Sequence, residues 1–130
     1  MPKNYTIIRK DRSRGRGGGI CIIVREGLNS KVCTDLNCVD TGNTEHLWCE
    51  ISTKDGINMI VIGLIYRPPN NNYEDDSKLN SLLITAEQQT IKKQLPVLGD
   101  FNYPDIRWDI GDAQSGTKQE EFMKTITELY

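Results

Sequence analysis

The stretch LPVLGDFNYPDIRW, residues 95–108, decides the fold that we predict for this 130-residue chain. It begins with a short apolar run, Leu95 to Leu98, typical of a strand covered on both faces inside an α/β sheet. The run stops at Gly99, and Asp100 and Asn102 follow two positions apart. Sheets of this kind carry ligand-binding groups at the carboxyl ends of their strands. The stretch therefore predicts a strand that ends at a candidate site.

Asp100 and Asn102 offer different chemistry at such a strand end. In an extended chain their side chains point to the same side, while Phe101 points the other way and can anchor the loop in the core. A carboxylate suits a hard cation or takes a proton from water, and a carboxamide contacts a phosphate oxygen without adding charge. The alternative is structural, because Gly-Asp and Asn-x-Pro are common in turns. The tetrapeptide alone leaves both interpretations open.

The remaining segments predict a layered α/β fold with helices outside the sheets. Apolar and alternating runs predict five further strands, of which 19–28 is expected to be central and 57–69 is the strongest: 5–9, 19–28, 30–36, 45–53 and 57–69. Alternation in the fourth puts Leu47, Cys49 and Ile51 on one face and His46, Trp48 and Glu50 on the other. The apolar spacing predicts helices over 77–93, with Ser77 as its cap, and over 118–130, with a loop over 103–117.

The charge of the chain is unevenly distributed. Residues 1–30 hold seven Lys/Arg and two Asp/Glu, a net charge of +5, whereas residues 31–130 carry a net charge of −7. A basic arm on an acidic body favours an anionic partner at one end. No apolar run approaches the roughly 20 residues of a membrane span, and the start has no apolar signal core. We therefore expect a nuclear or cytoplasmic protein that is not secreted.

Two further segments carry groups suited to phosphate. The loop RSRGRGGG holds Arg12, Arg14 and Arg16 and can touch a nucleic-acid backbone, or it can be a solvated turn. In YRPP, Tyr66 offers a phenol hydroxyl and Arg67 a bidentate fork to a phosphate. The alternative places Tyr66 at a sheet edge and Arg67 in solvent.

The cysteines and the single histidine give a weaker signal. The spacing C-x4-C-x7-H-x2-C is not a standard zinc pattern, and we expect free cysteines. His46 adjoins Glu45, but neighbours in a strand point to opposite faces, so the two do not easily form an acid–base pair. We expect His46 to be a surface or core residue.

Taken in order, these segments resemble the endonuclease domain of non-LTR retrotransposon reverse transcriptases, within the endonuclease/exonuclease/phosphatase superfamily. The resemblance is carried by YTIIRKDRSRGRGGGICIIVREGL, TEHLWCEI, IGLIYRPPN and LPVLGDFNYPDIRWD. It is strongest over residues 5–110. It implies a two-sheet α/β sandwich of that type, of which residues 1–130 form a partial domain, incomplete at both ends.

The resemblance also implies a chemistry for the strand ends. In the family, a Mg²⁺-assisted water hydrolyses a DNA phosphodiester. Asp100 matches the Asp that orients or deprotonates this water, Asn102 the Asn that contacts the phosphate, and Tyr66 the Tyr at the scissile phosphate. The metal-binding Glu and the Ser-Asp-His strand of the family have no counterpart in residues 1–130. The metal ligands are therefore unassigned, with Asp100 as a secondary contact at most, and we expect the chain alone to be inactive.

Two alternatives remain open. The chain can be a catalytically dead element remnant that at most binds nucleic acid through its basic N-terminal loop, or another phosphoesterase of the same superfamily. The resemblance implies DNA as a partner, together with the missing parts of the same polyprotein, including a reverse transcriptase domain.

Overall fold

The computed structural model describes residues 4–12, 18–91, 93–104, 106 and 117–129. They form a mixed α/β structure with two sheets and three helices. The strands are β1 (Tyr5–Asp11), β2 (Gly19–Arg25), β3 (Leu28–Val32), β4 (Glu45–Thr53), β5 (Met59–Tyr66) and β6 (Val97–Asp100). The helices are α1 (Thr34–Asn37), α2 (Tyr73–Gln89) and α3 (Lys118–Leu129). Among these residues, no helix is long and apolar enough to cross a membrane.

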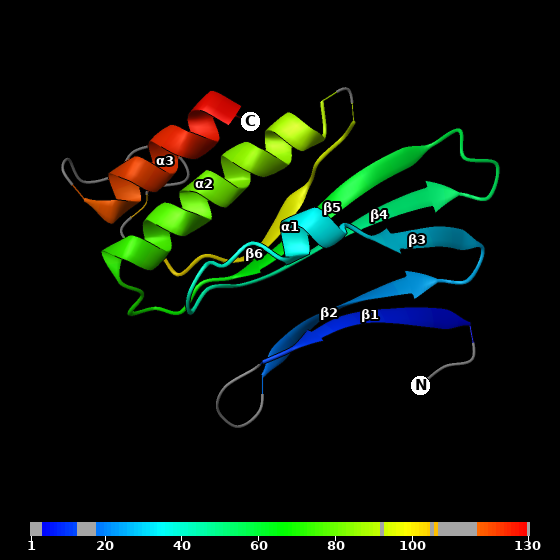
Figure 1. The fold of residues 1–130 in the computed structure, drawn as a ribbon, viewed down its shortest axis with the longest axis horizontal. Helices are drawn as coiled ribbons and strands as arrows, with labels where there is room; N and C mark the ends of the chain where they lie inside the picture. Colours follow the sequence, from blue (N-terminus) through cyan, green and yellow to red (C-terminus); the bar gives the residue numbers. More distant parts are fainter. Residues whose placement is uncertain (1–3, 13–17, 92, 105, 107–116, 130) are drawn as a thin grey trace.

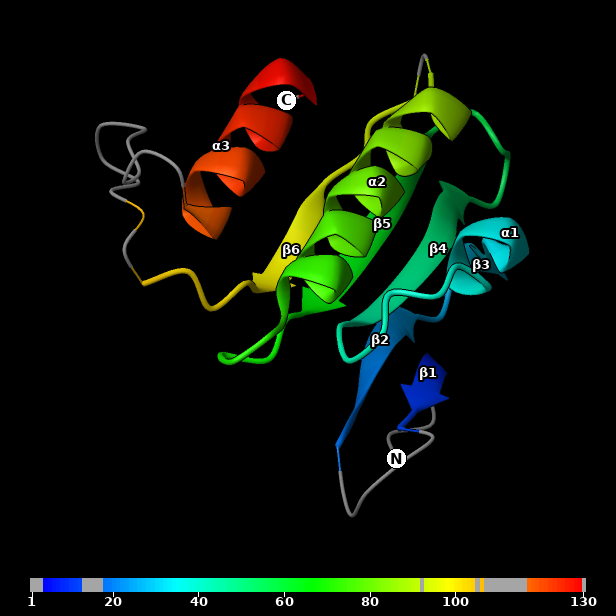
Figure 2. The ribbon, with the colours of Figure 1, turned by 60° about the vertical axis from the view of Figure 1, so that its left-hand side comes forward.

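The strands are divided between a hairpin and a larger sheet. β1 and β2 pair antiparallel as a two-stranded sheet, and the second sheet has the order β3-β4-β5-β6. Its first two pairings are antiparallel, while β5 and β6 run parallel and are joined through α2. Helices α2 and α3 lie on one face of the larger sheet and the β1–β2 hairpin lies on the other (Figures 1 and 2). This layering is compatible with the expected α/β sandwich.

β4 supplies side chains to the cores on both faces of the larger sheet. Trp48 is fully buried against α2 and α3 in a cluster with Ile65, Leu79 and Phe122. Its neighbour Cys49 belongs to a second cluster, which the β1–β2 hairpin covers. The alternation predicted for 45–53 is confirmed, because successive residues of the strand point to opposite layers.

Gly99 allows β6 to approach β5 closely. Its φ is +151°, and a Cβ atom at this position would overlap the carbonyl oxygen of Ile65, its partner in the parallel ladder. Residues with a side chain rarely adopt this conformation. The glycine that ends the apolar run is therefore required for the pairing that brings the ends of β5 and β6 together.

Several predicted boundaries and placements are wrong. β2 belongs to a two-stranded sheet and is not central, and residues 30–36 are divided between β3 and the short α1. β6 pairs with β5 alone among the described strands, and Leu98 is 57% exposed, so the strand is not covered on both faces. Most of the predicted loop at 103–117 lies outside the described residues.

Helix α2 begins four residues earlier than predicted, at Tyr73. The side chain of Asn72 caps it by accepting a hydrogen bond from the backbone N–H of Asp75 at 2.7 Å. Three acidic residues in the first turn, Glu74, Asp75 and Asp76, complement the positive end of the helix dipole. The predicted cap, Ser77, instead lies inside the helix. Residues 73–76, which precede the predicted start, thus form the first turn of the helix.

Candidate functional site

Three polar side chains form a row across the ends of adjacent strands. The register pairs Tyr66 with Asp100 on β6 and, on its other side, with Glu45 on β4. Paired residues on neighbouring strands point to the same face and stand about 5 Å apart. We refer to Glu45, Tyr66 and Asp100 as the strand-end rim. The structure therefore brings together the predicted site residues Tyr66 and Asp100.

Glu45 was not predicted as a member of this row. In the sequence it is only the first residue of an alternating strand beside His46. Its position next to Tyr66 depends on the antiparallel register of β4 and β5. A local pattern does not give that register, because hairpin register also depends on turn geometry.

Asn102 lies in a turn directly after the rim. Its φ is +49°, in the left-handed region, so the chain is not extended here, and the condition for Asp100 and Asn102 to point to the same side is not met. Its backbone N–H donates to Asp100 Oδ1 at 3.2 Å, and its side-chain Nδ2 donates to the carbonyl oxygen of Arg67 at 2.6 Å. The segment is therefore a turn, and whether its polar side chains also bind a ligand stays a prediction. Asp100 and Asn102 line a hollow of about 680 Å³ that extends to Asn70.

Phe101 anchors this segment, as predicted. Its side chain is half-buried and packs against the main core, with its ring centroid 5.1 Å from that of Phe122 on α3. The polar residues on either side of it are thereby held at the surface of a packed layer.

Arg67 is an internal residue, so the prediction that it binds phosphate is corrected. It is only 3% exposed. Its Nε and Nη2 donate to the two carboxylate oxygens of Asp76 at 2.7 and 2.9 Å, and its guanidinium lies 3.8 Å above the ring of Tyr103. A buried fork that is already paired is not available to a substrate. The solvent-exposed alternative for Arg67 is equally excluded by this burial.

The basic arm is partly engaged within the protein. Arg12 donates to Glu45 at 2.9 Å in an exposed ion pair, and Lys10 Nζ donates to the carbonyl oxygen of Asn37 at 3.0 Å. Burial lowers the pKa of Lys10. Exposed ion pairs are weak, so Arg12 can exchange its partner for a phosphate at little cost. Arg14 and Arg16 lie outside the described residues.

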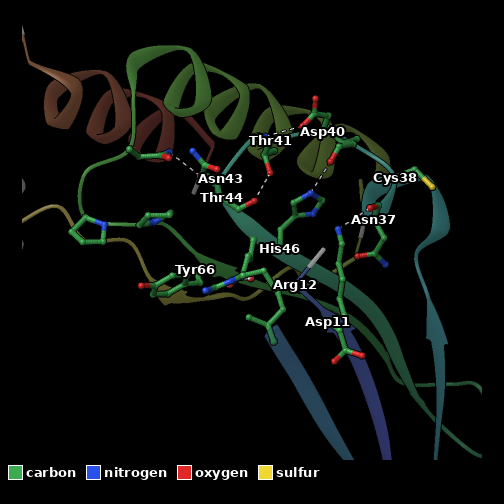
Figure 3. Close-up of a pocket in the computed structure, with 18 of the residues that line it drawn as sticks. Asp11, Arg12, Asn37, Cys38, Asp40, Thr41, Asn43, Thr44, His46 and Tyr66 are labelled. Carbon is green, nitrogen blue, oxygen red and sulfur yellow. Dashed lines mark hydrogen bonds and ion pairs between the residues drawn. The ribbon is translucent and has the colours of Figure 1, made fainter. Parts of the chain in front are cut away.

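A larger hollow of about 870 Å³ lies between the end of β1, the loop before β4 and the loop after β5. Figure 3 shows Arg12, Tyr66 and His46 around it, below the loop that carries Asp40 to Thr44. His46 itself is a core residue, 1% exposed, whose Nε2 meets the carbonyl oxygen of Val39 at 2.8 Å. Trp48 Nε1 donates to its Nδ1 at 3.0 Å. Both ring nitrogens are therefore used in the fold.

The stability of the chain should fall as the pH is lowered from about 6.5 to about 4, because burial lowers the pKa of His46 to about 4. In that window the unfolded chain binds a proton that the folded chain does not. The free energy of unfolding therefore falls by about 3 kcal/mol by the time the pH reaches the pKa of His46 in the folded chain. Denaturant unfolding of the native chain and of His46→Gln at pH 7 and pH 4.5 measures the effect. Carboxylates also titrate here, so the difference between the two proteins isolates His46. An identical pH dependence in both would contradict the assignment.

The residues described do not by themselves build a magnesium centre. No group of three or more His, Cys, Asp or Glu side chains that could hold a metal comes together among them. In the rim, Tyr66 separates Glu45 from Asp100, so the two backbone positions are about 10 Å apart, twice the strand spacing. Each carboxylate could supply one oxygen ligand, and further ligands would have to come from elsewhere.

Comparison with known proteins adds no further identification. No protein-family model matches the chain, and no curated protein matches it. The functional assignment therefore depends on the motifs and on the geometry of the strand ends.

Proposed function

We propose that this chain is part of a magnesium-dependent DNA endonuclease domain of the endonuclease/exonuclease/phosphatase type, in which the strand-end rim and Asn102 receive the scissile phosphodiester. Asp100 orients or deprotonates the attacking water, Tyr66 contacts the phosphate, and Asn102 offers an amide donor to the charge that develops there. Such positioned groups act by orientation and by electrostatic stabilisation.

One observation carries this proposal: the parallel register of β5 and β6 pairs Tyr66 with Asp100. The two motifs that support the family resemblance, Y-R-P-P and G-D-F-N, lie more than thirty positions apart in the sequence. Their polar residues Tyr66 and Asp100 nevertheless lie at adjacent strand ends. Asp100 and Asn102 line the smaller hollow, and Tyr66 lines the larger one, which shares Pro69 and Asn70 with it. The two motifs thus contribute polar residues to one edge of the sheet, which supports the proposal.

The completed domain provides the test. By completed domain we mean residues 1–130 joined to two sets of strands taken from a member of the family: those that carry the metal-binding Glu and those that carry Ser-Asp-His. We expect the chain alone to leave supercoiled plasmid intact in Mg²⁺, and the completed domain to relax it. The readout is the fraction of nicked circles against a buffer control. A folded completed domain that does not nick DNA would contradict the proposed function.

DNA binding by the chain alone should be weak and should depend on salt through three arginines. Arg12, Arg14 and Arg16 would make three phosphate contacts, which gives a log–log salt slope of roughly −2.7. Lys10 is committed to Asn37 and should not contribute. Fluorescence anisotropy with a labelled duplex at several salt concentrations measures the slope. It should become flatter when the three arginines are changed to Ala and stay the same in Lys10→Met. An unchanged slope in the triple variant would show that the contact lies elsewhere.

A further inference from the structure

Arg67 connects three parts of the molecule that meet at the candidate site. It follows the last residue of β5, and its Nε and Nη2 form a bidentate ion pair with Asp76 in the first turn of α2. Its third nitrogen, Nη1, donates to the carbonyl oxygens of Phe101 and Asn102 at 3.3 and 2.8 Å. The side chain thus joins the end of β5, the start of α2 and the segment after β6.

The contact between Arg67 and Asn102 is reciprocal. The guanidinium of Arg67 holds the backbone carbonyl of Asn102, and the backbone carbonyl of Arg67 accepts a hydrogen bond from Asn102 Nδ2 at 2.6 Å. Asn102 keeps a left-handed φ of +49° in this arrangement. Such a conformation costs free energy for a residue with a side chain and persists where the surroundings fix it. The two hydrogen bonds between Arg67 and Asn102, one donated by each residue, supply that constraint.

Asp76 keeps the guanidinium in place and neutralises its charge. Asp76 is 3% exposed, and it also accepts a hydrogen bond from Asn71 at 2.9 Å and lies 3.7 Å from Lys118 Nζ. A paired, desolvated arginine is not drawn toward an incoming phosphate as a free cation would be. The anchor can therefore stay fixed while a substrate binds.

We propose that Arg67 is a positioning residue that sets the orientation of the Asn102 carboxamide. Nδ2 is turned toward the Arg67 carbonyl, which leaves one N–H of Nδ2 and the Oδ1 oxygen to meet a substrate. Lysine would not replace it, since an ammonium cannot hold a carboxylate at two points and two carbonyl groups in one fixed plane. The identity of the substrate as a phosphodiester rests on the proposed function. The positioning of Asn102 is a property of this chain and does not depend on it.

The first test measures the Asn102 side-chain amide in the 130-residue chain by ¹H–¹⁵N NMR, with Asn102→Asp to assign its signals. We expect two protons of unequal chemical shift, with exchange against water slowed several-fold by the hydrogen bond. In Arg67→Lys the exchange should become several-fold faster. The Asn37 side chain, which donates to the carbonyl oxygen of Trp48 at 2.9 Å, reports whether the fold persists. Arg9→Lys, at an arginine 69% exposed, is the matched control.

Three results would overturn the proposal. The first is an unprotected Asn102 amide in the native chain, which needs no variant. The second is an unchanged Asn102 signal in folded Arg67→Lys. The third applies if Arg67→Lys does not fold, and it is an unchanged Asn102 signal in Asp76→Asn. That variant keeps the arginine but weakens the ion pair that holds its guanidinium in place.

The second test uses nicking by the completed domain. Arg67→Lys should lower kcat about as much as Asn102→Ala with little change in KM, and the double variant should be no slower than Asn102→Ala alone. Additive losses would overturn the positioning role, because residues that act through one another are non-additive. A completed domain without activity would refute the proposed function, and the NMR result would still decide how Arg67 acts on Asn102.

Discussion

Asp100→Asn in the completed domain should slow DNA nicking by about 10²–10⁴-fold, the usual loss when a positioned proton acceptor is removed. The substitution keeps the shape of the side chain and one acceptor oxygen. The hydrogen bond from the Asn102 backbone N–H can therefore persist. Asp100 is exposed, so the free energy of unfolding should change by about 0.5 kcal/mol or less. Single-turnover nicking measured beside thermal melting separates the two effects.

Two neighbouring variants make the Asp100 result specific. Asn102→Ala removes one donor to the developing charge and should cost roughly 10²–10³-fold in rate. Phe101→Ala should behave in the opposite way, lowering the free energy of unfolding by about 3 kcal/mol because its ring packs on Phe122. If Asp100→Asn nicks at the parent rate, or unfolds the domain while Phe101→Ala does not, the G-D-F-N segment is only a turn.

Arg67→Met should lower the free energy of unfolding by about 3–5 kcal/mol, because it leaves the carboxylate of Asp76 buried without its main partner. The loss also removes the hydrogen bonds to the carbonyl oxygens of Phe101 and Asn102. Methionine retains much of the apolar stem, so the effect reports the charge and the hydrogen bonds more than the volume. Denaturant unfolding at pH 7 gives the value.

Arg9→Met and a double variant are the controls for this prediction. Arg9 and its partner Asp11 are each 69% exposed, and an exposed ion pair contributes about 0–1 kcal/mol, so Arg9→Met should change little. Arg67→Met combined with Asp76→Leu should recover part of the loss, since the unpaired charge is then absent. Equal stability of Arg67→Met and the native chain would mean that the Arg67–Asp76 pair does not hold these elements together.

Local patterns predicted the parts of the structure that depend on local geometry. The alternation in β4 placed Trp48 and Cys49 on opposite faces correctly, and the apolar run before Gly99 located β6. The role of Arg67 was predicted wrongly and Glu45 was missed, because the positions of both depend on pairings between distant segments. The acidic first turn of α2 was missed, because the buried Asp76 pairs with Arg67, nine positions earlier in the chain. Hydrophobic periodicity carries no signal for such a pair.

The parallel pairing of β5 and β6 also determines when the site forms during folding. β4 and β5 are connected by a short turn and can pair within microseconds, as hairpins do. Tyr66 and Asp100 are 34 positions apart, and the segment between them contains all of α2. Contacts over such a separation bear a larger loop-closure entropy and form more slowly. The strand-end rim would therefore form late, after the helix has docked, and a partly folded chain would have the β4–β5 pair without Asp100 beside Tyr66.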